Sequence, residues 1–210
     1  RRVDFNPELP SIRPTYERWG YGLKSRYDGD KFFIGGTVFT AKDKADVISF
    51  DADALGLSPK GNLALGIEGG LSLIKNLQWS FEYGLSLMQQ DLRTNARKPY
   101  HAFKTELSYK LLGNQIGLAY ERISPDYETL GAYYFNNDYE NLTVNYSRNF
   151  FSDKLSLALS GGVQRDDLSD DKKEKNKRFV GSANIGFTPS DRFSLSLSAS
   201  SFQGHRNIKS

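Results

Sequence analysis

The sequence contains no cysteine, and that absence alone excludes several classes of protein. Its 210 residues include 14 Phe and 12 Tyr but only 1 Met and 2 His. Without thiols the chain forms no disulfide and offers no thiolate ligand to zinc or to an iron–sulfur cluster. It also has no run of about 18 or more apolar residues, which excludes a transmembrane helix. We expect no cofactor and no metal site.

A strong charge of one sign is missing as well. The 28 Lys and Arg residues face 25 Asp and Glu residues, which leaves a net charge of +3, and the basic residues are scattered. Nucleic-acid-binding proteins gather basic residues on one face, so no nucleic acid is expected as a partner. The two histidines, His101 and His205, lie beside expected loops. No serine has a spacing that selects it as a nucleophile, so the chain is not expected to be an enzyme.

What the chain does contain is a strict two-residue rhythm. In residues 77–88, large apolar and aromatic side chains alternate with mostly small or polar ones, and the pattern recurs in residues 63–73, 155–163 and 193–199. Successive side chains of a strand point to opposite faces, so each strand has one apolar and one polar face. This alternation is typical of an antiparallel transmembrane β-barrel, with lipid outside and a polar lumen inside.

About ten long strands are expected after an extended, proline-containing lead-in at residues 1–15. Most of them exceed the length of about 5–6 residues that is common in soluble sheets. The strands and their loops occupy residues 16–210. The expected strands are 16–27, 31–42, 61–74, 77–93, 101–112, 115–124, 139–151, 154–167, 177–188 and 191–203.

The connections alternate between short and long. Short ones such as Asp28-Gly29-Asp30 and Lys75-Asn76 have the residue types of tight hairpins. Bacterial barrels have short periplasmic turns and longer extracellular loops. The expected extracellular loops therefore lie near 43–60, 94–100, 125–138 and 168–176.

The alternation also assigns individual side chains to the two surfaces. A Lys or Arg side chain that faces lipid at the bilayer midplane costs about 2–4 kcal/mol, so charged residues should face the lumen. We predict that Leu157→Arg impairs membrane assembly more than Ser160→Arg. The predicted lipid-facing residues are Leu77, Trp79, Phe81, Leu155, Leu157, Leu195 and Leu197. The predicted lumen-facing residues are Glu82, Lys104, Glu106, Lys110, Glu121, Asn145 and Asn149.

One expected loop combines aromatic rings with amide and carboxylate groups. Such groups stack on sugars and hydrogen-bond to them, which suggests ligand capture at the cell surface. The structural alternative is an interfacial aromatic belt followed by a turn, which barrels need in any case, and we favour it. The residues concerned are Tyr133, Tyr134, Asn136, Asn137 and Asp138.

Three segments of the chain, residues 62–93, 130–168 and 182–202, resemble outer-membrane β-barrel proteins of Bacteroidota-type bacteria. The last contains a Thr-Pro-Ser turn between two alternating strands, a feature common in such proteins. The resemblance is one of style and includes no diagnostic motif, so no functional residue is carried over. It implies a location in the bacterial outer membrane of a Gram-negative cell, with the long loops at the cell surface.

The connection pattern places the start of the first strand and the end of the tenth on the extracellular side. In the resembled barrels both termini usually lie in the periplasm. We therefore expect the chain to be a section of a larger barrel, and a complete ten-stranded barrel with unusual ends is the alternative. The expected partners are outer-membrane lipid, further strands of the same barrel, and other envelope proteins or lipoproteins.

Several functions remain open at this point. The leading interpretation is a non-enzymatic, porin-like outer-membrane barrel that acts as a pore, transporter or secretion channel. A second is a structural barrel that scaffolds surface lipoproteins or an envelope complex, with long loops such as 43–60 as docking surfaces. A third is a soluble β-sandwich binding module, whose apolar face would turn inward against a second sheet. A barrel enzyme such as a phospholipase has the least support.

Overall fold

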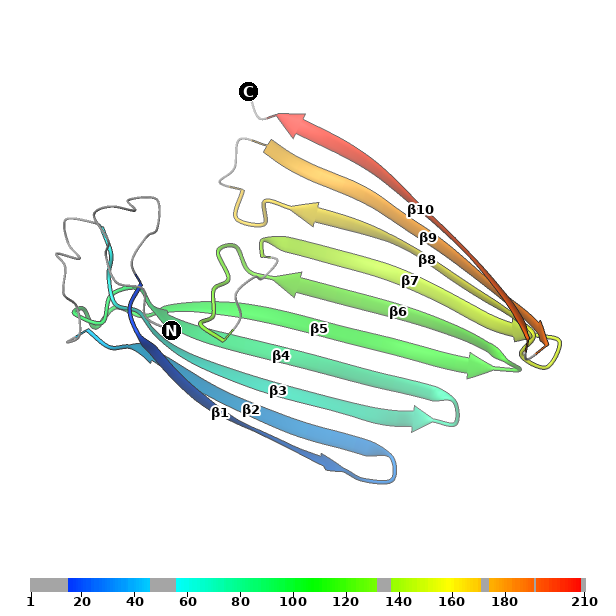
Figure 1. The fold of residues 1–210 in the computed structure, drawn as a ribbon, viewed down its shortest axis with the longest axis horizontal. Coiled ribbons are helices and arrows are strands. Elements are labelled where there is room, and N and C mark those ends of the chain that lie inside the picture. Colours follow the sequence, from blue (N-terminus) through cyan, green and yellow to red (C-terminus); the bar gives the residue numbers. More distant parts are fainter. Residues whose placement is uncertain (1–14, 46–55, 132–136, 171–173, 191, 209–210) are drawn as a thin grey trace.

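The computed structural model describes residues 15–45, 56–131, 137–170, 174–190 and 192–208. They form one antiparallel sheet in which every strand pairs with its neighbours in the sequence (Figure 1). The predicted all-β fold with about ten long antiparallel strands is confirmed. The strands are β1 (Arg18–Asp28), β2 (Phe32–Asp43), β3 (Gly61–Ile74), β4 (Leu77–Gln89), β5 (Lys98–Leu111), β6 (Asn114–Ile123), β7 (Tyr139–Phe150), β8 (Leu155–Asp166), β9 (Glu174–Ser190) and β10 (Phe193–Ile208).

The short and long connections lie at opposite ends of the sheet. The tight turns between β1 and β2, β3 and β4, and the later pairs of this kind lie together at one end (Figure 1). In two of them Asn76 and Gly113 have positive φ angles of 70° and 79°, which Asn and Gly adopt at low cost. The other strand ends, joined by longer connections, form what we call the long-loop end. Among the described residues no helix is long and apolar enough to cross a membrane.

Four strand ends differ from the sequence prediction by three residues or more, among them the start of β5 at Lys98, three residues earlier than expected. β4 ends at Gln89, four residues earlier than expected, because Asp91 accepts a hydrogen bond of 2.9 Å from the backbone N–H of Arg93 and holds the chain in a turn. β9 begins earlier and β10 ends later than expected, since the two strands pair along their full length, with Glu174 opposite Ile208. Apolar and polar residues do not alternate at the start of β9 or at the end of β10. The sequence pattern therefore gave no sign of these extensions, which form because the two strands pair with each other.

Strand register divides the sheet into two faces, because directly paired residues project to the same side. We call one the polar face; on it Glu82 of β4 lies opposite Lys104 of β5, and Lys104 opposite Glu121 of β6. The other is the apolar face, on which Trp79 of β4 lies opposite Leu107 of β5. The two-residue alternation of single strands is thus aligned across the whole sheet.

The apolar face carries no second layer among the described residues. Trp79, Val144 and Leu197 are 39%, 52% and 64% exposed on it. A soluble monomer rarely exposes a contiguous apolar patch of more than a few hundred Å². The exposed apolar side chains of this face extend from β1 to β10 and include Tyr21, Leu23, Ile34, Ile67, Leu107, Leu118, Leu142, Leu159, Ile185 and Leu195.

The sheet is open. Within the described part of the chain, β1 pairs only with β2, and β10 pairs only with β9. The closed ten-stranded barrel that the sequence left as an alternative is not formed by these residues. Both edge strands are long, at 11 and 16 residues, and each has one row of backbone groups without a strand partner.

Candidate functional site: the polar face and the loop docked on it

A row of charged side chains crosses the middle of the polar face. Glu82, Lys104 and Glu121 lie opposite one another on three adjacent strands, and Glu82 also lies opposite Glu68 of β3. The Glu68 carboxylate is 3.1 Å from the ammonium of Lys24 on β1. We call Lys24, Glu68, Glu82, Lys104 and Glu121 the charged row. It places both signs of charge side by side on one face of the sheet.

The register puts the two predicted sets of side chains on opposite faces. All seven residues predicted to face the lumen lie on the polar face. All seven predicted to face lipid lie on the apolar face. The pairs that establish this include Ser80–Glu106, Lys110–Gln115, Gly117–Asn145, Asn149–Ser156, Leu77–Tyr109, Phe81–Thr105, Leu155–Phe187, Leu157–Ile185 and Leu197–Ile185. Leu195 lies opposite Phe187 on the same apolar face. What each face contacts in the cell stays a prediction.

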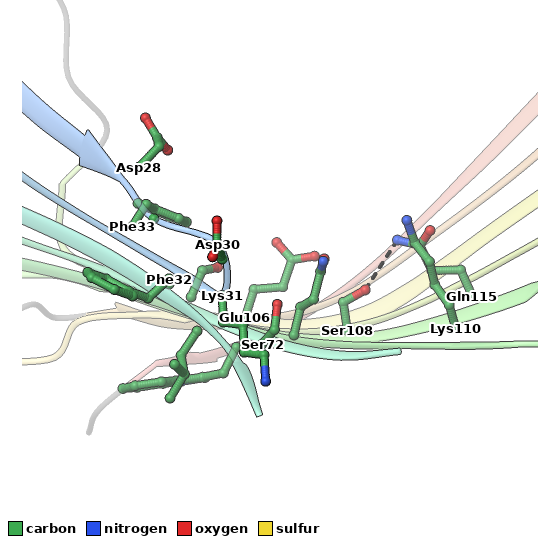
Figure 2. A pocket seen from close by; sticks show the side chains of 16 residues that line it. Asp28, Asp30, Lys31, Phe32, Phe33, Ser72, Glu106, Ser108, Lys110 and Gln115 are labelled. Carbon is green, nitrogen blue, oxygen red and sulfur yellow. Dashed lines mark hydrogen bonds between the residues drawn. The ribbon is translucent and has the colours of Figure 1, made fainter. Parts of the chain in front are cut away.

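An open hollow of about 430 Å³ lies on the polar face near the short turns. Figure 2 shows Glu106, Ser108 and Lys110 of β5 projecting to the same side of the sheet, with Gln115 of β6 beside them. The Gln115 amide donates a hydrogen bond of 3.3 Å to the Ser108 hydroxyl. The lining thus combines hydroxyl, amide and charged groups with aromatic residues such as Phe33.

The connection between β6 and β7 folds back onto the polar face. We call residues 124–131 the docked loop. Asn62 of β3 is its main anchor: the Asn62 side-chain oxygen accepts hydrogen bonds from the Thr129 hydroxyl at 3.0 Å and from the Leu130 backbone N–H at 3.2 Å. On β4, the Ser86 hydroxyl donates a 2.6 Å bond to the backbone carbonyl of Glu128. The loop therefore extends from β6 across β5 to β4 and β3.

The docked loop also supplies part of the protein's buried cluster. Tyr127 packs with Met88, Tyr100 and Ile123, all of which are at most 8% exposed. These three strand residues lie on the polar face, at its long-loop end. Tyr127 also lies over Gly84 of β4, where an added Cβ atom would be in ordinary van der Waals contact with its hydroxyl oxygen at 3.5 Å. The buried cluster therefore covers the polar face at the long-loop end.

The sequence placed residues 125–138 in an extracellular loop, which stays a prediction; the described part of this segment lies on the polar face and at the long-loop end. The aromatic pair Tyr133 and Tyr134, together with Asn136, lies outside the described residues. Asn137 is exposed and donates a 3.4 Å bond to the carbonyl of Tyr127. The Asp138 carboxylate is 2% exposed and accepts a 2.8 Å bond from the backbone N–H of Leu168. It joins two connections at the long-loop end and does not face outward to a ligand.

Sequence reasoning missed the residues that hold the loop in place. No sequence motif contains these residues, and each resembles an ordinary residue of a polar face or loop. They are Asn62, Ser86, Lys60 and Glu128. The usable signal was Asn62, an amide among the Leu, Ala and Gly residues of its strand. It is 4% exposed, and a buried amide needs hydrogen-bond partners, here donating 2.7 Å to the Ser86 hydroxyl.

Glu128 makes the docking of the loop depend on pH. Burial on its own raises the pKa of its carboxyl, but hydrogen bonds from Gln90 at 2.6 Å and Lys60 at 2.9 Å, with the charge of Lys60, hold that pKa below the ordinary value of 4.5. A lowered pKa means that the carboxylate stabilises the docked state above the ordinary value. That stabilisation is lost as pH falls through the lowered pKa.

We therefore expect the docked loop to loosen when pH falls below 4.5. Because the chain has no natural cysteine, Asp126→Cys, at a side chain 79% exposed, allows a polarity-sensitive dye to be attached to the loop. The dye's emission should shift as the pH is lowered from neutral to well below 4.5. The same labelled chain carrying Glu128→Gln should show a much smaller shift, and an equal shift in both would contradict the assignment.

Comparisons with known proteins give little beyond the fold. No protein-family model matches the chain. No curated protein matches it either. The solved structure found to be similar is the crystal structure of Pseudomonas aeruginosa OccK11 (OpdR), with 14% sequence identity and a TM-score of 0.47. The match covers 87% of this chain and 55% of that one, so this chain spans little more than half the length of OccK11.

Proposed function

We propose that the chain is a wall section of a non-enzymatic outer-membrane β-barrel that forms a channel for small hydrophilic solutes. The apolar face contacts lipid, and the polar face lines a lumen that contains water. The docked loop narrows this lumen near the long-loop end. The charged row and the hollow beside Glu106 and Lys110 are the surfaces that a passing solute meets.

One observation carries this proposal: large apolar side chains are exposed on one face across all ten strands, while the charged row crosses the middle of the opposite face. Exposing this much apolar surface to water costs free energy, and contact with lipid removes that cost. A β-sandwich, the soluble alternative, would cover this face with a second sheet, and the described residues form a single layer. The strands are 10 to 17 residues long, so each is long enough to supply the about 9–11 residues that a tilted strand needs to cross the hydrocarbon.

The open edges of β1 and β10 fit the same proposal. In hydrocarbon an unpaired backbone N–H or C=O group costs several kcal/mol, so sheets in membranes close on themselves. We infer that further strands of the same barrel pair with both edges. Bacterial barrels contain even numbers of strands, from about 8 to 26 and beyond, so a barrel larger than these ten strands is within the known range.

The first test is where the full-length protein goes when cells are fractionated. We expect it to sediment with outer membranes and to migrate faster on a gel before heating than after, as folded barrels do. A protein that stays soluble and monomeric without detergent would contradict the proposal and favour the β-sandwich. Conductance across a planar bilayer then separates a channel from a structural barrel that scaffolds lipoproteins.

A further inference from the structure

A group of basic side chains lies on the apolar face, close to the long-loop end of β6 to β9. Arg122 of β6 lies opposite Glu140 of β7, Glu140 opposite Arg165 of β8, and Arg165 opposite Lys177 of β9. We call Arg122, Arg165 and Lys177 the basic row. Its members lie far apart in the sequence, and the sheet brings them together at one level of its outer surface.

Glu140 orients the two guanidinium groups without neutralising the row. Its carboxylate accepts a 2.5 Å bond from the Tyr120 hydroxyl, hydrogen-bonds to Nε of Arg165, and lies 3.5 Å from a terminal nitrogen of Arg122. Glu140 is 16% exposed, whereas both arginines are 49% exposed. Their remaining N–H donors therefore face outward, so the group presents three positive charges against one half-buried negative charge.

Lys177 adds a third positive charge to the basic row. Its ammonium lies 5.8 Å from the centre of the Phe179 ring, and it forms no ion pair within the described part of the chain. Phe179 and Leu142 occupy the next position toward the middle of the apolar face and are 52% and 47% exposed. The basic row is thus bordered on its membrane side by exposed apolar side chains.

The level of the basic row on the sheet is that of a membrane interface. Arg122 is one residue from the end of β6, and Arg165 is one residue from the end of β8. A charge on the lipid face of a barrel costs about 0–1 kcal/mol near the interface, against about 2–4 kcal/mol at the midplane. Among strand residues whose side chains the structure describes, the other Lys and Arg residues on the apolar face are Lys42 of β2 and Arg148 of β7, on separate strands.

We propose that the basic row binds the phosphate groups of a lipid in the leaflet on the long-loop side. This inference rests on the proposed function, because it requires the apolar face to contact lipid. An arginine guanidinium group can donate two parallel hydrogen bonds to the oxygens of one phosphate, and the lysine ammonium adds a further positive charge. The exposed Phe179 and Leu142 would lie along the acyl chains of the same lipid, so headgroup and chains are held by adjoining surfaces.

The test compares two lipids and two sets of variants of the full-length protein in detergent. The probes are lipid A with two phosphate groups and the same lipid after both phosphates are removed. One variant carries Arg122→Gln, Arg165→Gln and Lys177→Gln. The matched control carries Lys24→Gln, Lys104→Gln and Lys110→Gln, which removes the same charge from the polar face. Binding is measured by native mass spectrometry, and folding by heat-dependent gel mobility.

We expect the unchanged protein and the polar-face control to prefer the phosphorylated lipid by at least about tenfold, and the basic-row variant to lose that preference. Lys177→Gln alone leaves the Glu140 contacts intact and should weaken binding about fivefold, so the test stands even if the triple variant does not fold. Equal binding of the two lipids by a protein that does insert in membranes overturns this inference alone. Failure to insert at all overturns the proposed function instead.

Discussion

Leu159→Arg is expected to lower the free energy of unfolding of the membrane-inserted protein by about 2–4 kcal/mol, and Ser160→Arg by much less. Leu159 is 41% exposed on the apolar face, opposite Tyr146 and Ala183, and it lies mid-strand in β8. Ser160 is the next residue and lies on the polar face, opposite Asn145 and Ser182. The two substitutions add the same charge to adjacent positions and differ only in the surface that receives it.

The measurement is the fraction of full-length protein that reaches outer membranes in its fast-migrating, unheated form. Each 1.4 kcal/mol corresponds to about a tenfold change in equilibrium, so a difference of this size is easy to detect. Leu157, the position that the sequence suggested for this test, is a weaker choice because it lies opposite Arg148, where charge is already present on that face. Equal yields for Leu159→Arg and Ser160→Arg would undo the assignment of lipid and lumen to the two faces.

The sequence was sufficient for the sheet because the period of two is local. Trp79 and Glu82 had to face opposite ways once their segment was a strand, and short turns such as Lys75-Asn76 fixed which strands pair. The tight turn between β5 and β6 also sets the register that places Lys104 opposite Glu121. The alignment of Glu82 with Lys104 crosses the long connection between β4 and β5, so no local signal sets it. The ten strands and the division of side chains between two faces were therefore predictable.

The docked loop was not predictable in this way. Its anchor joins Asn62 to Thr129 and Leu130, which are 67 and 68 residues further along the chain. Neither a pattern nor a spacing links these positions, because the contact exists only after four strands have paired. The basic row was missed for a related reason: Arg122, Arg165 and Lys177 lie on three separate strands, and the sheet register alone aligns them.

Asn62→Leu is expected to release the docked loop and to increase conductance severalfold. Leucine has a similar volume but cannot accept the bonds from Thr129 and Leu130 or donate to Ser86. Each polar group left buried without a partner costs about 1–3 kcal/mol, so leaving several of them unpaired in the docked state favours the undocked one. Water then reaches the part of the polar face that the buried cluster covers.

Asn145→Leu is the matched control, since Asn145 lies on the same polar face opposite Gly117 and Ser160, away from the docked loop. It changes the polarity of the proposed lumen equally and should leave single-channel conductance in planar bilayers nearly unchanged. If the unchanged protein is silent and Asn62→Leu conducts, the loop closes the lumen, which favours the scaffold over the channel. If the unchanged protein conducts and Asn62→Leu conducts more, the loop narrows an open passage. Identical conductance for Asn62→Leu and Asn145→Leu would mean that the docked loop does not obstruct the lumen.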